Sequence, residues 1–150
     1  MNLHRHDAAS AAAALTMVRE MFPELDDVTF AAVDWLGRQY LETDGVLAVF
    51  DPGSAEVRPH YHPTVDEALA AAPDELLRTD LLAEWRARHP EPLAAGWCAG
   101  YRQPLFLGGE DSADNLEAVD LAAYWSTRGR TWLRVKDLPP DRRIGGVIPG

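Results

Sequence analysis

Two segments in the first third of the chain carry apolar residues at helical spacing. Residues 7–21 are rich in good helix formers and are followed by Pro23, which ends a helix. Residues 27–40 carry a mostly apolar stripe, although Gly37 lies within it. The spacing predicts a helix in each segment. The apolar positions are Leu15, Val18 and Phe22 in the first segment, and Val28, Ala31, Ala32, Trp35 and Leu36 in the second.

A continuous apolar run over residues 46–50 is followed by the turn sequence Asp51-Pro52-Gly53-Ser54 and then by residues 55–61. Proline presets φ and glycine accepts a positive φ, so this stretch predicts a β-hairpin with a central first strand. Pro59 cannot donate a hydrogen bond to a neighbouring strand. The second strand is therefore expected near a sheet edge.

Helical signals return in the middle of the chain. Thr64 can cap a helix and Glu67 completes a capping box, so a short helix is expected from there to about residue 72. Pro73 starts a second piece, and residues 74–89 trace another helical face before Pro90. The apolar positions of that face are Leu76, Leu77, Leu81, Leu82 and Trp85.

Three short runs in the last third of the chain predict strands: residues 96–101, 103–107 and 115–119. The pair Gly108-Gly109 closes the second run. Asp120 can cap a final helix that ends before Pro139.

These elements indicate an α+β protein in which a mixed or antiparallel sheet packs against several helices. A chain of 150 residues has the usual length of a single domain, and no repeat or low-complexity linker divides it. Residues 1–26 are expected to form an N-terminal helical segment of the same domain as residues 27–150.

Fourteen Lys and Arg residues against 24 Asp and Glu residues give a formal charge of −10. This charge repels phosphate backbones and anionic lipids, so neither a nucleic-acid partner nor a membrane is expected. A basic protein partner would suit it, whereas the general explanation is an acidic surface kept for solubility. The single cysteine cannot form an internal disulfide, and the Ala-rich residues 8–15 are too short for a membrane span, which favours a cytoplasmic setting.

Two histidine pairs invite a metal interpretation, since alternate residues on a strand point the same way. They are His4 with His6 and His60 with His62. No cysteine pair or carboxylate at ligand spacing accompanies either pair, so we assign no metal. The Gly108-Gly109 pair precedes several carboxylates that would repel a phosphate group, so no nucleotide or other cofactor is expected.

No residue has the surroundings of a catalytic nucleophile. Cys98 lies between Trp97 and Ala99 in an apolar run, which predicts a buried, unreactive thiol. No serine lies in a Gly-x-Ser-x-Gly elbow, and no histidine is placed to activate one. We therefore expect a binding protein without catalytic residues. The serines considered are Ser10, Ser54, Ser112 and Ser126.

Acidic side chains are the candidate contacts for a basic partner. The segment of residues 110–114 holds three carboxylates in five residues, and we predict that it borders the partner surface. A second acidic set lies on the predicted helix that precedes it. The candidates are Glu110, Asp111 and Asp114 in the segment, and Glu75, Asp80 and Glu84 on the helix.

One stretch in the last third of the chain reads Gly96-Trp97-Cys98-Ala99-Gly100-Tyr101-Arg102-Gln103-Pro104-Leu105-Phe106-Leu107-Gly108-Gly109-Glu110-Asp111. This stretch resembles the C-terminal domain of type VI secretion DNase-immunity proteins, and more distantly the SUKH group of toxin-immunity proteins. The likeness continues through Asp114-Asn115-Leu116-Glu117, Asp120 and Tyr124-Trp125 to Gly129, Leu138 and Pro139, and spans about residues 27–144. Upstream it includes Leu36-Gly37-Arg38-Gln39-Tyr40 and the Asp51-Pro52-Gly53 turn.

The resemblance implies that residues 27–150 form an immunity-protein-like domain, which binds and neutralises a cognate bacterial toxin such as a nuclease effector. The alternative is a non-catalytic regulatory or scaffolding module that binds another protein; a toxin gene beside this one would favour immunity. The shared motif has a mostly structural interpretation, in which Trp125 and Leu105 belong to one core. Its residues are Pro104, Leu105, Gly108, Gly109, Asn115, Asp120, Tyr124 and Trp125.

Overall fold

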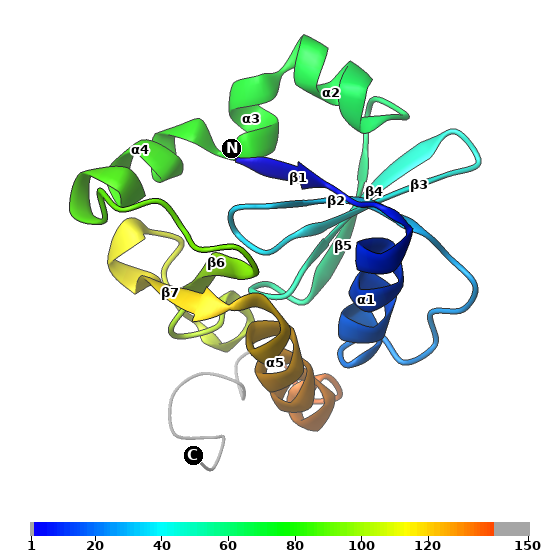
Figure 1. The fold of residues 1–150 in the computed structure, drawn as a ribbon. Coiled ribbons are helices and arrows are strands. Elements are labelled where there is room, and N and C mark those ends of the chain that lie inside the picture. The colour runs from blue at the N-terminus through cyan, green and yellow to red at the C-terminus, as the bar shows by residue number, and fades with distance from the viewer. Residues whose placement is uncertain (1, 140–150) are drawn as a thin grey trace.

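The computed structural model describes residues 2–139 and has an α+β fold, which confirms the predicted class (Figure 1). Within that range, five strands form an antiparallel sheet in the order β1-β2-β3-β4-β5. Two further strands, β6 and β7, pair antiparallel in a smaller sheet. The strands are β1 (Leu3–Arg5), β2 (Phe30–Asp34), β3 (Gln39–Thr43), β4 (Val46–Asp51), β5 (Glu56–His60), β6 (Trp97–Tyr101) and β7 (Leu116–Asp120).

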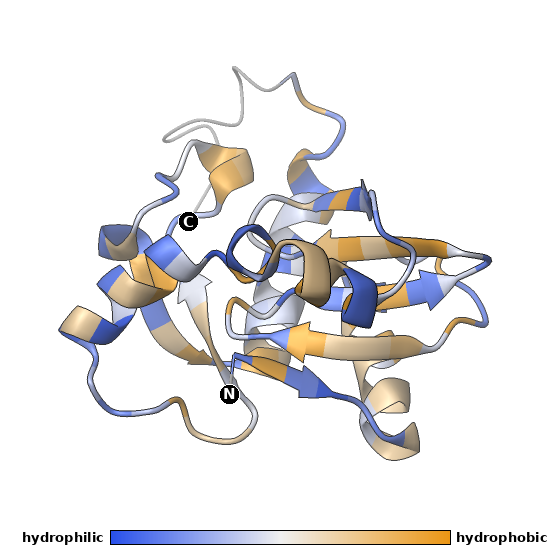
Figure 2. Ribbon diagram, turned by 90° about the horizontal axis from the view of Figure 1, so that it is seen from above, coloured by the Kyte–Doolittle hydropathy of each residue, from blue (hydrophilic) through white to orange (hydrophobic). Residues whose placement is uncertain are grey.

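Helices cover both faces of the larger sheet. Tyr40 and Val49 pack with buried residues of α2 and α3 on one face. Leu41 and Phe50, their neighbours in sequence, pack with buried residues of α1 on the other face. Figure 2 shows hydrophobic residues along these strands, as two covered faces require. The helices are α1 (Ala8–Arg19), α2 (Val65–Ala71), α3 (Pro73–Leu77), α4 (Thr79–Arg88) and α5 (Leu121–Val135), with 3-10 turns η1 (Leu105–Leu107) and η2 (Ala113–Asn115).

Most of the predicted elements are confirmed. The hairpin forms as β4 and β5, and β5 lies at the sheet edge, as Pro59 predicts. Thr64 caps α2 by accepting a hydrogen bond from the Glu67 N–H at 3.1 Å. Asp120 caps α5 in the same way through the Ala123 N–H at 2.9 Å. The predicted helix over residues 74–89 is divided into α3 and α4 at Arg78, whose φ is 53°.

The helix predicted over residues 27–40 is wrong, because this segment forms β2, a tight turn and β3. Asp34 directs the turn: its Oδ1 accepts hydrogen bonds from the N–H groups of Leu36 and Arg38, both at 3.0 Å. Gly37 supplies the φ of 78° that the turn needs. A strand buried on both faces has a continuous apolar run, which periodicity cannot distinguish from a buried helix.

The strand predicted over residues 103–107 is also wrong, because Leu105–Leu107 form the 3-10 turn η1. The Leu105 N–H donates to the Gly53 carbonyl at 2.8 Å, so this segment docks on the β4–β5 turn instead of joining a sheet. Gly108 ends the turn with a φ of 84°.

Trp125 and Leu105 do not share one core cluster, contrary to the prediction. Trp125 packs with Phe30 and Phe50, and its Nε1 donates to the Gly37 carbonyl at 2.9 Å. Leu105 instead packs against the cluster around Trp35, on the side of α4 and β6. The reason is that α5 lies between the smaller sheet and α1, and its Trp125 packs on the side of α1 and the larger sheet.

Candidate functional site

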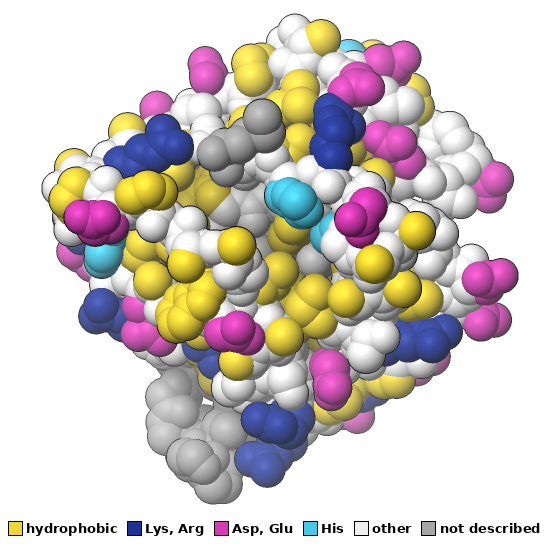
Figure 3. All heavy atoms as spheres, in the orientation of Figure 1, with side chains coloured by type: hydrophobic (Ala, Val, Ile, Leu, Met, Phe, Trp, Pro, Cys, Tyr) yellow, Lys and Arg dark blue, Asp and Glu magenta, His cyan; other side chains and the backbone are white. Residues whose placement is uncertain are grey.

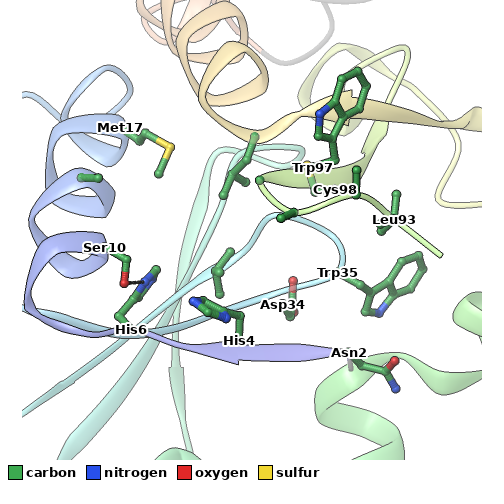
Figure 4. Close-up of a pocket in the computed structure, with 16 residues that line it drawn as sticks. Asn2, His4, His6, Ser10, Met17, Asp34, Trp35, Leu93, Trp97 and Cys98 are labelled. Atoms are coloured by element: carbon green, nitrogen blue, oxygen red, sulfur yellow. Dashed lines mark hydrogen bonds between the residues drawn. The ribbon is translucent and has the colours of Figure 1, made fainter.

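Two mostly apolar cavities adjoin each other at Trp97, the first residue of β6. One pocket of about 410 Å³ lies between β1, α1 and the start of β6 (Figure 4). A second pocket of about 480 Å³ lies between the end of α4 and the same strand. Leu93, Ala94 and Trp97 line both pockets. We call this surface the Trp97 face.

The Trp97 side chain is 46% exposed, which is unusual for so large an apolar group. Its backbone N–H donates to the Ala94 carbonyl at 3.0 Å, and Gly96 takes a φ of 79°. This tight turn holds the indole at the surface, at the point where the strand begins. In Figure 4, Met17 of α1 and Trp97 lie on opposite sides of the first pocket. In Figure 3, hydrophobic side chains gather across the middle of the face seen in Figure 1.

A chain of polar groups lines the α1 side of the first pocket. The Ser10 Oγ lies 3.0 Å from His6 Nδ1, and His6 Nε2 lies 2.8 Å from Oε1 of Gln39, which is fully buried. The expectation that no histidine is placed to activate a serine is therefore wrong for Ser10. The sequence spacing of four hid this pair, because His6 precedes the helix and turns back over its first turn.

This chain of groups is joined to the N-terminal cap of α1. The Asp7 carboxylate accepts the Ser10 N–H at 2.8 Å, and the Ser10 Oγ accepts the Asp7 N–H at 2.9 Å. The pKa of Asp7 is lowered, first by the Ser10 N–H and then by the Ser10 hydroxyl. Asp7 thus occupies the N–H groups at the start of α1 that could otherwise stabilise an oxyanion.

Cys98 is confirmed as buried, with 1% of its surface exposed. Burial raises the pKa of the thiol, and the nearby Asp34 carboxylate raises it further. A thiolate, the reactive form, is therefore disfavoured.

Two of the three carboxylates in the segment 110–114 are engaged by arginines. Asp111 accepts a hydrogen bond from the Tyr101 hydroxyl at 2.6 Å and forms an ion pair with Arg78 at 3.0 Å. Asp114 forms an ion pair with Arg88. Glu110 is exposed, and no ion pair of its carboxylate is present within residues 2–139. That this segment borders a partner surface stays a prediction.

The second acidic set is divided between two helices. Glu75 lies on α3, whereas Asp80 and Glu84 lie on α4, and all three are exposed. Of the six predicted acidic contacts, the structure brings only Glu75 and Asp111 into one pocket, together with three arginines.

Three residues of the motif, Asn115, Gly109 and Tyr124, make close contacts within the fold. The Asn115 side chain accepts the Gln103 N–H at 3.0 Å and donates to the carbonyls of Gln103 and Glu110 at 2.9 and 2.8 Å. A Cβ on Gly109 would lie 2.0 Å from the Gln103 carbonyl oxygen, so only glycine fits there. The Tyr124 hydroxyl accepts the Tyr101 N–H at 3.1 Å.

Neither histidine pair gathers a third ligand. His4 and His6 have ring centroids 5.9 Å apart, as do His60 and His62. Among residues 2–139, no group of three His, Cys, Asp or Glu side chains could hold a metal ion. In the same range, every helix is too short or too polar to cross a membrane.

Sequence reasoning missed the Trp97 face, because an alternating strand pattern does not show which end of the strand emerges at the surface. The only signal was the neighbouring run of loop-forming residues, Pro90 to Gly96. Comparison of the chain with protein-family models and with curated proteins finds no match.

Proposed function

We propose that this protein is an immunity protein that neutralises a cognate bacterial toxin by binding it, and that the Trp97 face contacts the toxin. The observation that carries the proposal is a half-exposed tryptophan between two adjoining apolar pockets. Exposed apolar surface of this kind marks protein contact sites, and tryptophan is enriched among the residues that dominate binding energy.

Charge supports a basic partner. The net charge of −10 would attract a toxin with a positive active-site groove, such as a nuclease, and would speed the encounter. The sequence motif that resembles type VI secretion DNase-immunity proteins supports the same class of partner. The Ser10–His6–Gln39 chain does not favour an enzyme, because the nearby N–H donors already serve the Asp7 cap.

The test uses a candidate toxin, chosen from the genes that neighbour this one. Trp97→Ala should weaken binding by at least about 2 kcal/mol, roughly thirtyfold, because truncation removes an anchor shared by both pockets. Tyr61→Ala is the matched control, since Tyr61 is an aromatic residue that is 95% exposed and lines neither pocket. Calorimetric titration measures both. Equal affinities for the two variants would rule out the Trp97 face as the contact.

A further inference from the structure

A separate pocket of about 320 Å³ lies on the opposite face of the larger sheet, between β4, β5, α3 and the segment that follows β6. Six charged side chains line it: Arg38, Asp51, Arg58, Glu75, Arg78 and Asp111. We call it the Asp51 pocket. The lining has three positive and three negative side chains. The arginines, however, are paired with carboxylates, two of which do not line the pocket, so unpaired negative charge remains in it.

Each of the three arginines already has a carboxylate partner. Arg38 Nη2 lies 2.6 Å from Asp34 Oδ2 and also donates to the Leu76 carbonyl at 2.6 Å. Arg58 pairs with Glu56 at 2.5 Å, and Arg78 pairs with Asp111 at 3.0 Å.

The carboxylates of Asp51 and Glu75 have no cation at ion-pair distance within residues 2–139. Asp51 accepts the Gly53 N–H at 2.8 Å. The buried Ser54 hydroxyl faces Asp51 and interacts with its carboxylate, which lowers the pKa of Asp51. The pocket therefore holds two carboxylates and a hydroxyl oxygen that can accept hydrogen bonds from a cationic donor.

We propose that the Asp51 pocket binds a basic side chain of the partner, with its guanidinium or ammonium group placed between Asp51 and Glu75 and the Ser54 hydroxyl as a further acceptor. This inference rests on the proposed function, because it names one contact of the same toxin. An anion is disfavoured, since all three arginines are neutralised and Asp51 would repel it.

Burial raises the pKa of Asp51, and Arg38 and the Gly53 N–H oppose the rise only in part. A bound cation would favour the charged carboxylate and so relieve this cost. The Asp51 carboxylate is therefore stabilised more by a cationic ligand than an exposed carboxylate would be.

The first test needs no toxin. N-acetyl-arginine amide, titrated into isotope-labelled protein, should shift the amide signals of Gly53 and Ser54 in NMR spectra. N-acetyl-citrulline amide has nearly the same shape without the charge and should not. Asp51→Asn keeps the acceptor for the Gly53 N–H, and it should weaken arginine-amide binding at least tenfold, as should Glu75→Gln. Asp80→Asn and Glu84→Gln on α4 are the controls and should leave binding unchanged.

Several results would overturn the proposal. They are an absence of arginine-amide shifts, equal shifts with citrulline amide, or inorganic phosphate binding at the same amides. Thermal unfolding of each variant shows whether it is folded. If Asp51→Asn does not fold, Glu75→Gln still tests the proposal, because it alters only an exposed side chain.

The second test uses the toxin, whose affinity should fall at least tenfold in Glu75→Gln and not in Glu84→Gln. Arginine-amide binding with unchanged toxin affinity would show a site for free cations and refute the partner's side chain as the occupant. The two proposals can fail separately. Trp97 does not line the Asp51 pocket, so Trp97→Ala should leave arginine-amide binding unchanged even if the Trp97 face does not contact the toxin.

Discussion

Asp51 shows how a single residue can be kept for binding at a cost in stability. Its carboxylate is partly buried, and it accepts a hydrogen bond from the Gly53 N–H in the β4–β5 turn. The sequence predicted only the turn, because Asp-Pro-Gly is typical of turns with or without a pocket behind them. The pocket arises from α3 and the segment after β6, which are distant in the chain.

The raised pKa of Asp51 predicts a pH-dependent cost that Asp51→Asn removes. The folded state binds this proton more tightly than the unfolded state, so the contribution of Asp51 to the free energy of unfolding falls as pH rises from about 4 toward neutrality. Asparagine does not titrate. The free energy of unfolding of Asp51→Asn, relative to the parent, should therefore increase across this range.

Chemical denaturation at about pH 4 and about pH 7 measures this difference. The other charged or titratable groups that line the pocket are unchanged in both proteins and serve as the internal reference; they are Arg38, Arg58, His60, Glu75, Arg78 and Asp111. A relative stability that is constant or decreases with pH would contradict a raised pKa of Asp51 in the folded protein.

At the scale of elements, helix ends and hairpin turns were predictable from sequence, whereas the character of fully buried segments was not. Thr64 and Asp120 act as caps through local hydrogen bonds, which sequence encodes directly. The segment 27–40 was misassigned because β2 is covered on both faces, by α2 and α3 on one and by α1 and Trp125 on the other. Local pattern alone carries no information about such coverage.

The crossing of α1 and α5 depends on Gly129. A Cβ at this position would lie 2.6 Å from both the carbonyl carbon and the carbonyl oxygen of Glu20, at the end of α1. Gly129→Ala should therefore destabilise the protein by about 1–3 kcal/mol, although alanine alone would favour the helix by about 1 kcal/mol. Thr127→Ala, at an exposed position of α5, should have a smaller effect. Denaturant unfolding compares them, and a stabilised Gly129→Ala would show that the helices can separate freely.

For the whole molecule, the acidic charge and the fold class follow from sequence, but the surface that binds does not. Net charge is a sum over residues, and a value of −10 would suit a basic partner as well as serve solubility. Which surface binds a charged partner depends on which acidic side chains are already paired with arginines. Asp111 and Asp114 are neutralised by Arg78 and Arg88, whereas Glu75 is left unpaired within residues 2–139. Those pairings join residues 26 or more positions apart, which no local pattern reports.

The central claim is that the protein neutralises a toxin by binding it, without chemistry. The most direct measurement is the residual activity of a candidate toxin chosen from the neighbouring genes, titrated with purified protein at a toxin concentration far above the dissociation constant. Inhibition should increase linearly and be complete at a fixed stoichiometry near one equivalent, and intact, active toxin should be recovered when denaturant separates the two. Inactivation by a small fraction of an equivalent, or permanently modified toxin, would reveal an enzyme and contradict the account, as would a toxin whose activity is unaffected at any ratio.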